Sequence, residues 1–325
     1  MFTLPKWQKK GLIYKCDRRT FFKTHSTRPI PFLINKQKLR IFFSSRDERN
    51  IPYPTFIDVL PSDPSIVLHI NDQPMIELGK IGAFDDSGIT PVSILKEEGK
   101  NPLMYYAGWK RRRYGVTIEA SIGVLEMSSD GSSISRIFDG PLIGQDRNHP
   151  VLVAAPFVTK RDGGYDMWYC SASEWRKMEH GFEMLYTIFH AQSKDGFSWK
   201  QLSNEPSIIT SYDEEVISAP WVVDTKEGKI MWYSMRGSSS IKSKNYMAGV
   251  ATSVDGINWI RRDLEVGIEK SQTGWDSQMI CYPATFNYDD RSYLFYSGND
   301  VGKGGIGYAV ADKKIEMISA ANNKK

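Results

Sequence analysis

The segment APWVVDTKEGKIMWYSMR at positions 219–236 decides the fold. It joins two runs rich in apolar and aromatic residues, 219–223 and 230–235, through a short turn that contains Gly228. Two such runs separated by a few turn residues predict an antiparallel β-hairpin. The first run contains Pro220, and the second contains the aromatic pair Trp232 and Tyr233.

The same hairpin recurs along the whole chain. The equivalent prolines are separated by 62, 65, 64 and 63 residues: Pro29, Pro91, Pro156, Pro220 and Pro283. An aromatic pair follows each proline at a nearly constant distance: 42–43, 105–106, 168–169, 232–233 and 295–296. A period of about 60 residues, kept over four intervals, indicates a repeat architecture.

In three of the five repeats a third strand leads into a Ser-x-Asp-Gly turn, at 128–131, 193–196 and 253–256. Asp-Gly is favoured in tight hairpins, so these aspartates are interpreted as turn residues and not as catalytic acids. The repeat is therefore a four-stranded antiparallel meander. We predict an all-β fold, a five-bladed β-propeller formed by residues 1–325 as one domain, with blades starting near 28, 90, 155, 219 and 282. Residues 12–15 are expected to supply the strand that closes blade 5.

Composition excludes several other classes of protein. A net charge of +4 over 325 residues is too small to indicate nucleic-acid binding, and the cluster 110–113 is its only basic run. Cys16, Cys170 and Cys281 are widely spaced, which predicts reduced thiols in a cytoplasmic protein. The five histidines show no metal-ligand spacing, and no membrane span is apparent. We predict no metal and no cofactor.

The two ends of the blades differ in chemistry. The turns within hairpins 1–2 and 3–4 are short, whereas the 2–3 loops and the connections between blades carry carboxylates, arginines and indoles. These groups bind sugar hydroxyls, anionic substituents and sugar faces, respectively. We therefore predict a carbohydrate site at this end, with these binding residues: Arg28, Arg46, Asp47, Trp109, Glu119, His149, Trp175, Arg236 and Asn299.

Residues 20–312 resemble the five-bladed propeller glycosidase superfamily, which includes arabinanases, xylosidases, invertases, levansucrases and mannoside phosphorylases. The resemblance rests on the proline-anchored strands, on second strands such as WYS at 232–234, and on the hairpins that close with Trp199 and Trp259. Segments 44–47, 82–88 and 231–237 are similar to a branch found among bacterial surface-polysaccharide genes. The resemblance implies a carbohydrate-active enzyme.

The chain departs from the superfamily at the acidic positions. The hydrolases of that group place carboxylates directly before the inner-strand prolines, but here those positions hold Arg28, Thr90, Ala155, Ala219 and Tyr282. Carboxylates occur a few residues further upstream, at Asp86, Glu215 and Asp276. We predict Asp86 and Glu215 as the acid/base pair, with Asp276 assisting.

Three functions follow as alternatives. The first is cleavage or phosphorolysis of a glycosidic bond in a carbohydrate substrate. Arg28, Arg46, His149 and Arg236 would form an anion pocket, which favours phosphorolysis, or an anionic or phosphorylated sugar, over plain hydrolysis. The second is glycosyl transfer from an activated sugar during polysaccharide synthesis, although no Gly-rich nucleotide motif is present. The third is binding of a glycan without catalysis, which the missing inner-strand acids favour.

Overall fold

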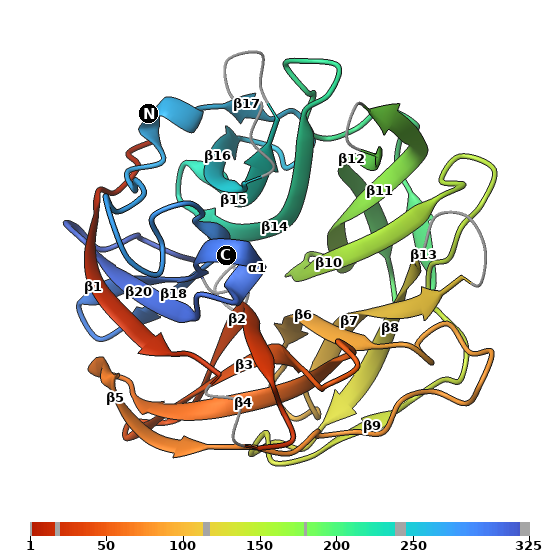
Figure 1. Ribbon diagram of the computed structural model, residues 1–325. Helices are drawn as coiled ribbons and strands as arrows, with labels where there is room; N and C mark the ends of the chain where they lie inside the picture. Colours follow the sequence, from red (N-terminus) through yellow and green to blue (C-terminus); the bar gives the residue numbers. More distant parts are fainter. Residues whose placement is uncertain (1, 17–19, 113–117, 179–180, 238–244, 319–325) are drawn as a thin grey trace.

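The computed structural model describes residues 2–16, 20–112, 118–178, 181–237 and 245–318. Five four-stranded antiparallel sheets surround a central axis as the blades of a propeller (Figure 1), which confirms the predicted fold. Two short helical segments lie in loops, η1 (Asp263–Glu265) and α1 (Asn299–Gly302). Among the described residues, no helix has the length and apolarity needed to cross a membrane.

Each blade runs from an inner strand beside the axis to an outer strand at the rim (Figure 1). Blade 1 contains β2 (Thr24–Asn35), β3 (Lys38–Arg46), β4 (Pro52–Leu60) and β5 (Asp63–Ile70). Blade 2 contains β6 (Ile89–Leu95), β7 (Leu103–Arg111), β8 (Ile118–Met127) and β9 (Ile134–Arg136). Blade 3 contains β10 (Leu152–Arg161), β11 (Gly164–Met178), β12 (Gly181–Ser193) and β13 (Trp199–Gln201). Blade 4 contains β14 (Val216–Thr225), β15 (Gly228–Arg236), β16 (Met247–Ser253) and β17 (Ile260–Arg261).

Blade 5 joins the two ends of the chain. It contains β18 (Cys281–Tyr288), β19 (Arg291–Ser297) and β20 (Ile306–Ala311), and β1 (Trp7–Tyr14) pairs with β20 as its outer strand. The register places Trp7 opposite Ala311. The predicted closure by an N-terminal strand is confirmed, although the strand begins earlier than residue 12.

The aromatic pairs fix each blade to both of its neighbours. Successive side chains of a strand point to opposite faces, so the two members of a pair enter different interfaces. Trp232 packs in the cluster that joins blades 4 and 5, and Tyr233 packs in the cluster on the side of blade 3. Both side chains are essentially inaccessible to water. The repeated aromatic pair therefore forms the core between the blades.

The inner strands carry a bulge at the repeated proline. The preceding residue has a left-handed backbone in four blades, with φ of 63° at Arg28, 53° at Ala155, 55° at Ala219 and 56° at Tyr282. The pairing register shifts at these same points. A bulge turns its extra residue out of the regular pleat. Arg28 and Tyr282 consequently line the central pocket.

Candidate functional site

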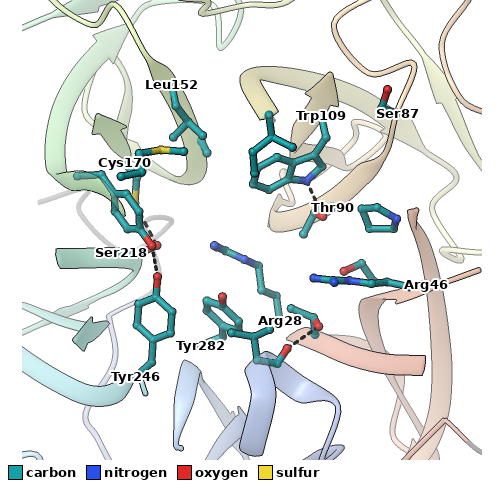
Figure 2. Close-up of a pocket in the computed structure, with 18 of the residues that line it drawn as sticks. Arg28, Arg46, Ser87, Thr90, Trp109, Leu152, Cys170, Ser218, Tyr246 and Tyr282 are labelled. Carbon is teal, nitrogen blue, oxygen red and sulfur yellow. Dashed lines mark hydrogen bonds between the residues drawn. The ribbon is translucent and has the colours of Figure 1, made fainter. Parts of the chain in front are cut away.

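A pocket of about 580 Å³ lies at the centre of the propeller, at the end of the blades where the 2–3 loops gather. Residues from all five blades line it (Figure 2). On the axis beneath it, Pro29, Pro220, Pro283 and Trp221 enclose a space of only about 20 Å³, to which Arg28 and Tyr282 also contribute. The central pocket is therefore nearly closed at its floor and is entered from the loop end.

Arg28 is directed into the middle of this pocket (Figure 2). Its guanidinium carbon lies 4.3 Å from the ring centroid of Tyr282, which is a cation–π contact. Its Nη1 atom is buried and has no hydrogen-bond partner among the described residues. A buried guanidinium nitrogen without a partner is costly, so the pocket favours a ligand that supplies an acceptor there.

Three further arginines make the pocket strongly cationic: Arg46, Arg111 and Arg236. Burial lowers the pKa of Arg46; Tyr282 opposes this change, whereas the positive charge of Arg111 adds to it. Arg111 is exposed and donates to the backbone carbonyl of Arg49 at 3.0 Å. The electrostatic strain between Arg46 and Arg111 would be relieved by a bound anion.

Glu183 is the one carboxylate among the described residues that line the pocket. It lies near the start of β12 and accepts a hydrogen bond from Nη1 of Arg236 over 3.0 Å. Burial lowers the pKa of Arg236, but Tyr186 and Glu183 outweigh that effect and leave this pKa above its ordinary value. Four arginines thus face a single acidic side chain.

Aromatic side chains form the rest of the wall. The indole of Trp109 donates from Nε1 to Oγ1 of Thr90 over 2.9 Å, which fixes the ring beside the pocket (Figure 2). Trp175 lies on the neighbouring blade, and its side chain is partly exposed. The ring centroid of Tyr246 lies 5.3 Å from the guanidinium carbon of Arg236, and the hydroxyl of Tyr246 is hydrogen-bonded to the hydroxyl of Tyr186. Indoles held at a cavity wall present flat apolar faces to a sugar ring.

Five of the predicted binding residues line this pocket: Arg28, Arg46, Trp109, Trp175 and Arg236. The other four have their own partners elsewhere. Asp47 accepts from the backbone of Ile51 at 2.9 Å, and Asn299 accepts from the backbone of Gln278 at 2.7 Å. Glu119 pairs with Arg112 outside the central pocket. His149 is buried, with Nδ1 2.5 Å from Oγ of Ser171.

None of the three predicted catalytic carboxylates lines the pocket. Asp86 lies one residue from the pocket wall, and Ser87, which is part of that wall, donates to its Oδ1 over 2.6 Å. Glu215 forms two hydrogen bonds of 2.7 Å with Arg261, so it is bound to the outer strand β17.

Asp276 is buried and accepts from Lys9 at 2.9 Å and from Tyr296 at 3.0 Å. The structure therefore holds Asp86, Glu215 and Asp276 in three separate hydrogen-bond networks and does not bring them together. Their catalytic roles stay predictions.

Several pocket residues are not among the binding residues predicted from the sequence: Arg111, Glu183, Tyr186, Tyr246 and Tyr282. Tyr282 carries a signal that could have identified it, because it directly precedes a repeated proline as Arg28 does. Glu183 carries none, because it lies within a strand and belongs to no repeated motif. Among the described residues, no group of three or more His, Cys, Asp or Glu side chains is arranged to hold a metal ion.

Two proteins of Mycobacterium tuberculosis are similar to this chain over nearly its whole length. Both are 31% identical to it over 309 residues, covering 94% of this chain and 99% of their own length. They are the uncharacterized protein Rv1502 of strain ATCC 25618 / H37Rv and the uncharacterized protein MT1551 of strain CDC 1551 / Oshkosh. No family model matches the chain.

Solved structures with the same fold include glycoside hydrolases. One of them, described simply as a glycoside hydrolase, is 16% identical and superposes with a TM-score of 0.72, covering 97% of this chain and 94% of the other. A glycosyl hydrolase from Bacteroides ovatus is 14% identical, with a TM-score of 0.72 and coverage of 98% and 97%.

A third structure comes from work on the GH130 family of mannoside phosphorylases, which contains glycoside hydrolases that target β-1,2 mannosidic linkages in Candida mannan. It is 15% identical, with a TM-score of 0.68 and coverage of 98% and 97%. Identities this low establish the fold and leave the activity open. The protein thus has the five-bladed propeller fold of these glycoside hydrolases and belongs to the same family as the mycobacterial protein Rv1502.

Proposed function

We propose that this protein is a carbohydrate-active enzyme that cleaves a glycosidic bond in the central pocket, with an anion bound among the arginines. One observation carries the proposal: Arg28, Arg46, Arg111 and Arg236 surround a pocket walled by Trp109 and Trp175. Indoles suit a sugar ring, and guanidinium groups bind phosphate or carboxylate through paired hydrogen bonds. The glycoside hydrolases of the same fold support a carbohydrate as the ligand.

The composition of the pocket favours phosphorolysis over hydrolysis. Hydrolysis generally requires two carboxyl groups across the glycosidic bond, and the described lining supplies only Glu183. Phosphorolysis requires one carboxylic acid, because the phosphate itself is the nucleophile. A phosphate oxygen attacks the anomeric carbon, the glycosidic carbon–oxygen bond breaks, and the departing oxygen takes a proton from the acid. The products are a sugar 1-phosphate and the shortened glycan.

Glu183 is the side chain we assign as this acid. Its partner Arg236 is one of the four arginines, so an anion bound to Arg236 competes with Glu183 for that guanidinium. Weakening an ion pair makes protonation of the carboxylate less costly. Binding of phosphate would thereby prepare Glu183 to donate its proton only when the nucleophile is in place.

The experiment is to incubate the protein with neutral oligosaccharides, with and without inorganic phosphate, and to analyse the products. Release of a sugar 1-phosphate that requires phosphate is the expected result. Equal release of free sugar in both conditions would overturn phosphorolysis and favour hydrolysis. Turnover of nucleotide sugars alone would instead support glycosyl transfer.

A second function, glycan binding without catalysis, is favoured by the same shortage of carboxylates. It predicts that glycans raise the thermal unfolding temperature while no product forms. A ligand at 100 times its Kd adds about 2.7 kcal/mol to the free energy of unfolding, which a thermal-shift assay detects.

A further inference from the structure

The central pocket has two sides that differ in chemistry. Figure 2 shows Arg46 and Trp109 on one side and Tyr246 on the opposite side. Arg236 belongs to the side of Tyr246, because its guanidinium carbon lies 5.3 Å from the centroid of that ring. Glu183 lies there too, since it accepts the hydrogen bond from Arg236. We call these two regions the Arg46 side and the Glu183 side.

On the Arg46 side, Arg46 and Arg111 are both hydrogen-bonded to Asn50. Nη1 of Arg46 donates to Oδ1 of Asn50 at 3.0 Å. Nη2 of Arg111 donates to the backbone carbonyls of Arg49 and Asn50 at 3.0 Å and 3.3 Å. Arg46, Asn50 and Arg111 all line the pocket. Because the accepting oxygens are neutral, these contacts orient the two guanidinium groups without balancing their charge.

The turn that contains Asn50 is fixed by hydrogen bonds of its own. The backbone N–H of Asn50 donates to the carbonyl of Asp47 at 3.1 Å, and the N–H of Ile51 donates to Oδ1 of Asp47 at 2.9 Å. Asn50 has a left-handed backbone, with φ of 63°, which asparagine adopts more readily than most residues. The two arginines are thus held before a ligand arrives, which reduces the entropy lost on binding.

The charge of this pair is not compensated by the protein. Arg40 shows the alternative, because it is buried and forms an ion pair with Asp58 at 2.7 Å. The hydrogen bonds of Arg46 and Arg111 to described residues go only to neutral oxygens. The positive charge of Arg111 also contributes to lowering the pKa of Arg46, as expected for like charges held close together. The Arg46 side is therefore suited to an anionic group.

The phosphate of the proposed reaction does not account for this requirement. It competes with Glu183 for Arg236 and so belongs to the Glu183 side. A phosphate ion is also small compared with a pocket of about 580 Å³, so it leaves Arg46 and Arg111 free. A second anionic group is then expected from the glycan itself.

We propose that Arg46 and Arg111, held by Asn50, bind an anionic substituent of the sugar unit that stacks on Trp109. Trp109 and Arg111 both line the pocket from the end of β7. The substituent is a carboxylate, as in a hexuronic acid, or an ester phosphate, because both accept paired hydrogen bonds from guanidinium groups. This inference rests on the proposed function, since it takes the ligand to be a carbohydrate. A neutral glycan lacks the contact and should be a weaker ligand.

Three variants that change the net charge equally test this assignment. Arg46→Gln removes one guanidinium group. Asn50→Asp keeps both arginines but places a carboxylate where both are hydrogen-bonded, and aspartate also tolerates the left-handed backbone. The control is Arg49→Gln, because Arg49 belongs to the same turn, has a side chain that is 64% exposed and is not part of the described pocket wall. Should Arg46→Gln fail to fold, Asn50→Asp still tests the proposal.

The experiment is calorimetric titration in the presence of inorganic phosphate. The ligands are disaccharides of mannuronate, galacturonate and glucuronate, their neutral counterparts, and the 6-phosphates of the three hexoses. For at least one sugar, we expect the wild type to bind the acidic form about tenfold more tightly than the neutral form. Arg46→Gln and Asn50→Asp should bind the acidic form no better than the neutral form, whereas Arg49→Gln should behave as the wild type. Preference for a hexuronate identifies a carboxylate, and preference for a 6-phosphate identifies an ester phosphate.

Separate outcomes would overturn the inference and the proposed function. If acidic and neutral sugars bind the wild type alike, the inference fails while the proposed function stands. Loss of inorganic phosphate binding in Arg46→Gln and Asn50→Asp would assign the arginine pair to that ion instead of the sugar. Equal loss of the acidic preference in Arg49→Gln would trace it to overall charge. If no saccharide binds the wild type, the proposed function fails and this inference fails with it.

Discussion

The hydroxyl of Tyr296 donates to Oδ2 of Asp276 over 3.0 Å, and Lys9 of the closing strand reaches the same oxygen at 2.9 Å. The contact links an aromatic pair of the core, a connection between blades and the outer strand of the same blade. Because Tyr296 is fully buried, its hydroxyl needs a partner inside the protein. Asp276 supplies that partner and holds the connection in place.

The same arrangement recurs in blade 2. The hydroxyl of Tyr106 donates to Asp85 at 3.0 Å, and Arg136 of the outer strand reaches the same oxygen at 2.8 Å. In blade 4 the acceptor for Tyr233 is Asp263, at 2.6 Å. A buried tyrosine that joins an acid and a basic outer strand is therefore a repeated structural device.

Replacement of Asp276 by asparagine should lower the free energy of unfolding by about 2 kcal/mol. The substitution removes the charge that Lys9 neutralises, and breaking a largely buried ion pair from one side is destabilising. Chemical denaturation measures the effect. Asp290→Asn serves as the control, because Asp290 is an exposed turn residue. If the two variants lose the same free energy of unfolding, the contacts of Asp276 with Lys9 and Tyr296 do not stabilise the fold.

Glu215→Gln and Asp86→Asn test the acid/base pair predicted from the sequence. Glu215 is buried in its contact with Arg261, so we expect Glu215→Gln to lose stability, by about 2 to 3 kcal/mol. Asp86 does not line the pocket and only accepts a hydrogen bond from the pocket residue Ser87. We therefore expect Asp86→Asn to remain stable and to retain most of its turnover. A hundredfold or greater fall in kcat for Asp86→Asn, with normal stability, would establish the predicted catalytic role.

Glu183→Gln should abolish turnover and leave binding of inorganic phosphate unchanged or stronger. The amide cannot donate a proton as a carboxylic acid does, and it no longer competes as an anion for Arg236. Product analysis and phosphate titration together measure the two effects. Turnover at the wild-type rate would exclude Glu183 as the acid.

Arg28→Asn should weaken the binding of inorganic phosphate by about tenfold. Asparagine tolerates the left-handed backbone found at this position, so the fold should be retained. The loss should shrink at high salt, because charge interactions are then screened. The exposed residue Arg291 provides the control variant Arg291→Asn. Equal weakening in both variants would show that phosphate is held by overall charge and not in the pocket.

Stability should fall in mild acid because of His25. Burial lowers the pKa of His25 to about 3, and the charges of Arg46 and Lys303 act in the same direction. Between pH 6.5 and 3 the unfolded chain takes up a proton that the folded protein does not, so the free energy of unfolding decreases as the pH is lowered. From pH 7 to pH 5 we expect a loss on the order of 1 to 2 kcal/mol from this group.

His25→Asn is the variant that isolates this contribution, because His25 also has a left-handed backbone, at φ 65°. Denaturation curves at pH 7 and pH 5 should differ less for the variant than for the wild type. An unchanged pH dependence would assign the acid sensitivity to other groups.

The fold was predictable because the repeated residues are those that shape the backbone of the inner strands and fill the core between the blades. The proline spacing located the five inner strands, and the aromatic pairs located the contacts between blades. Arg28 and Arg236 were placed in the pocket by the same logic, since each lies at the loop end of a strand near the axis.

The carboxylates were not predictable in this way. A connection between blades can turn its side chains towards the axis or towards the rim, and the outcome depends on distant partners. For Asp276 the decisive partner is Lys9, which lies 267 positions away in the chain. Glu183 enters the pocket through the pairing of β11 with β12, and no local pattern in the sequence signals that position.

The pairing of Trp7 with Ala311 has a consequence for synthesis of the protein. A ribosome adds about 5 to 20 residues per second, so β1 waits roughly 15 to 60 s before its partner strand β20 exists. During that interval β1 is an unpaired strand whose backbone groups are open to other chains. Ring closure is thus a late event, and the nascent protein is most exposed to aggregation before blade 5 is complete.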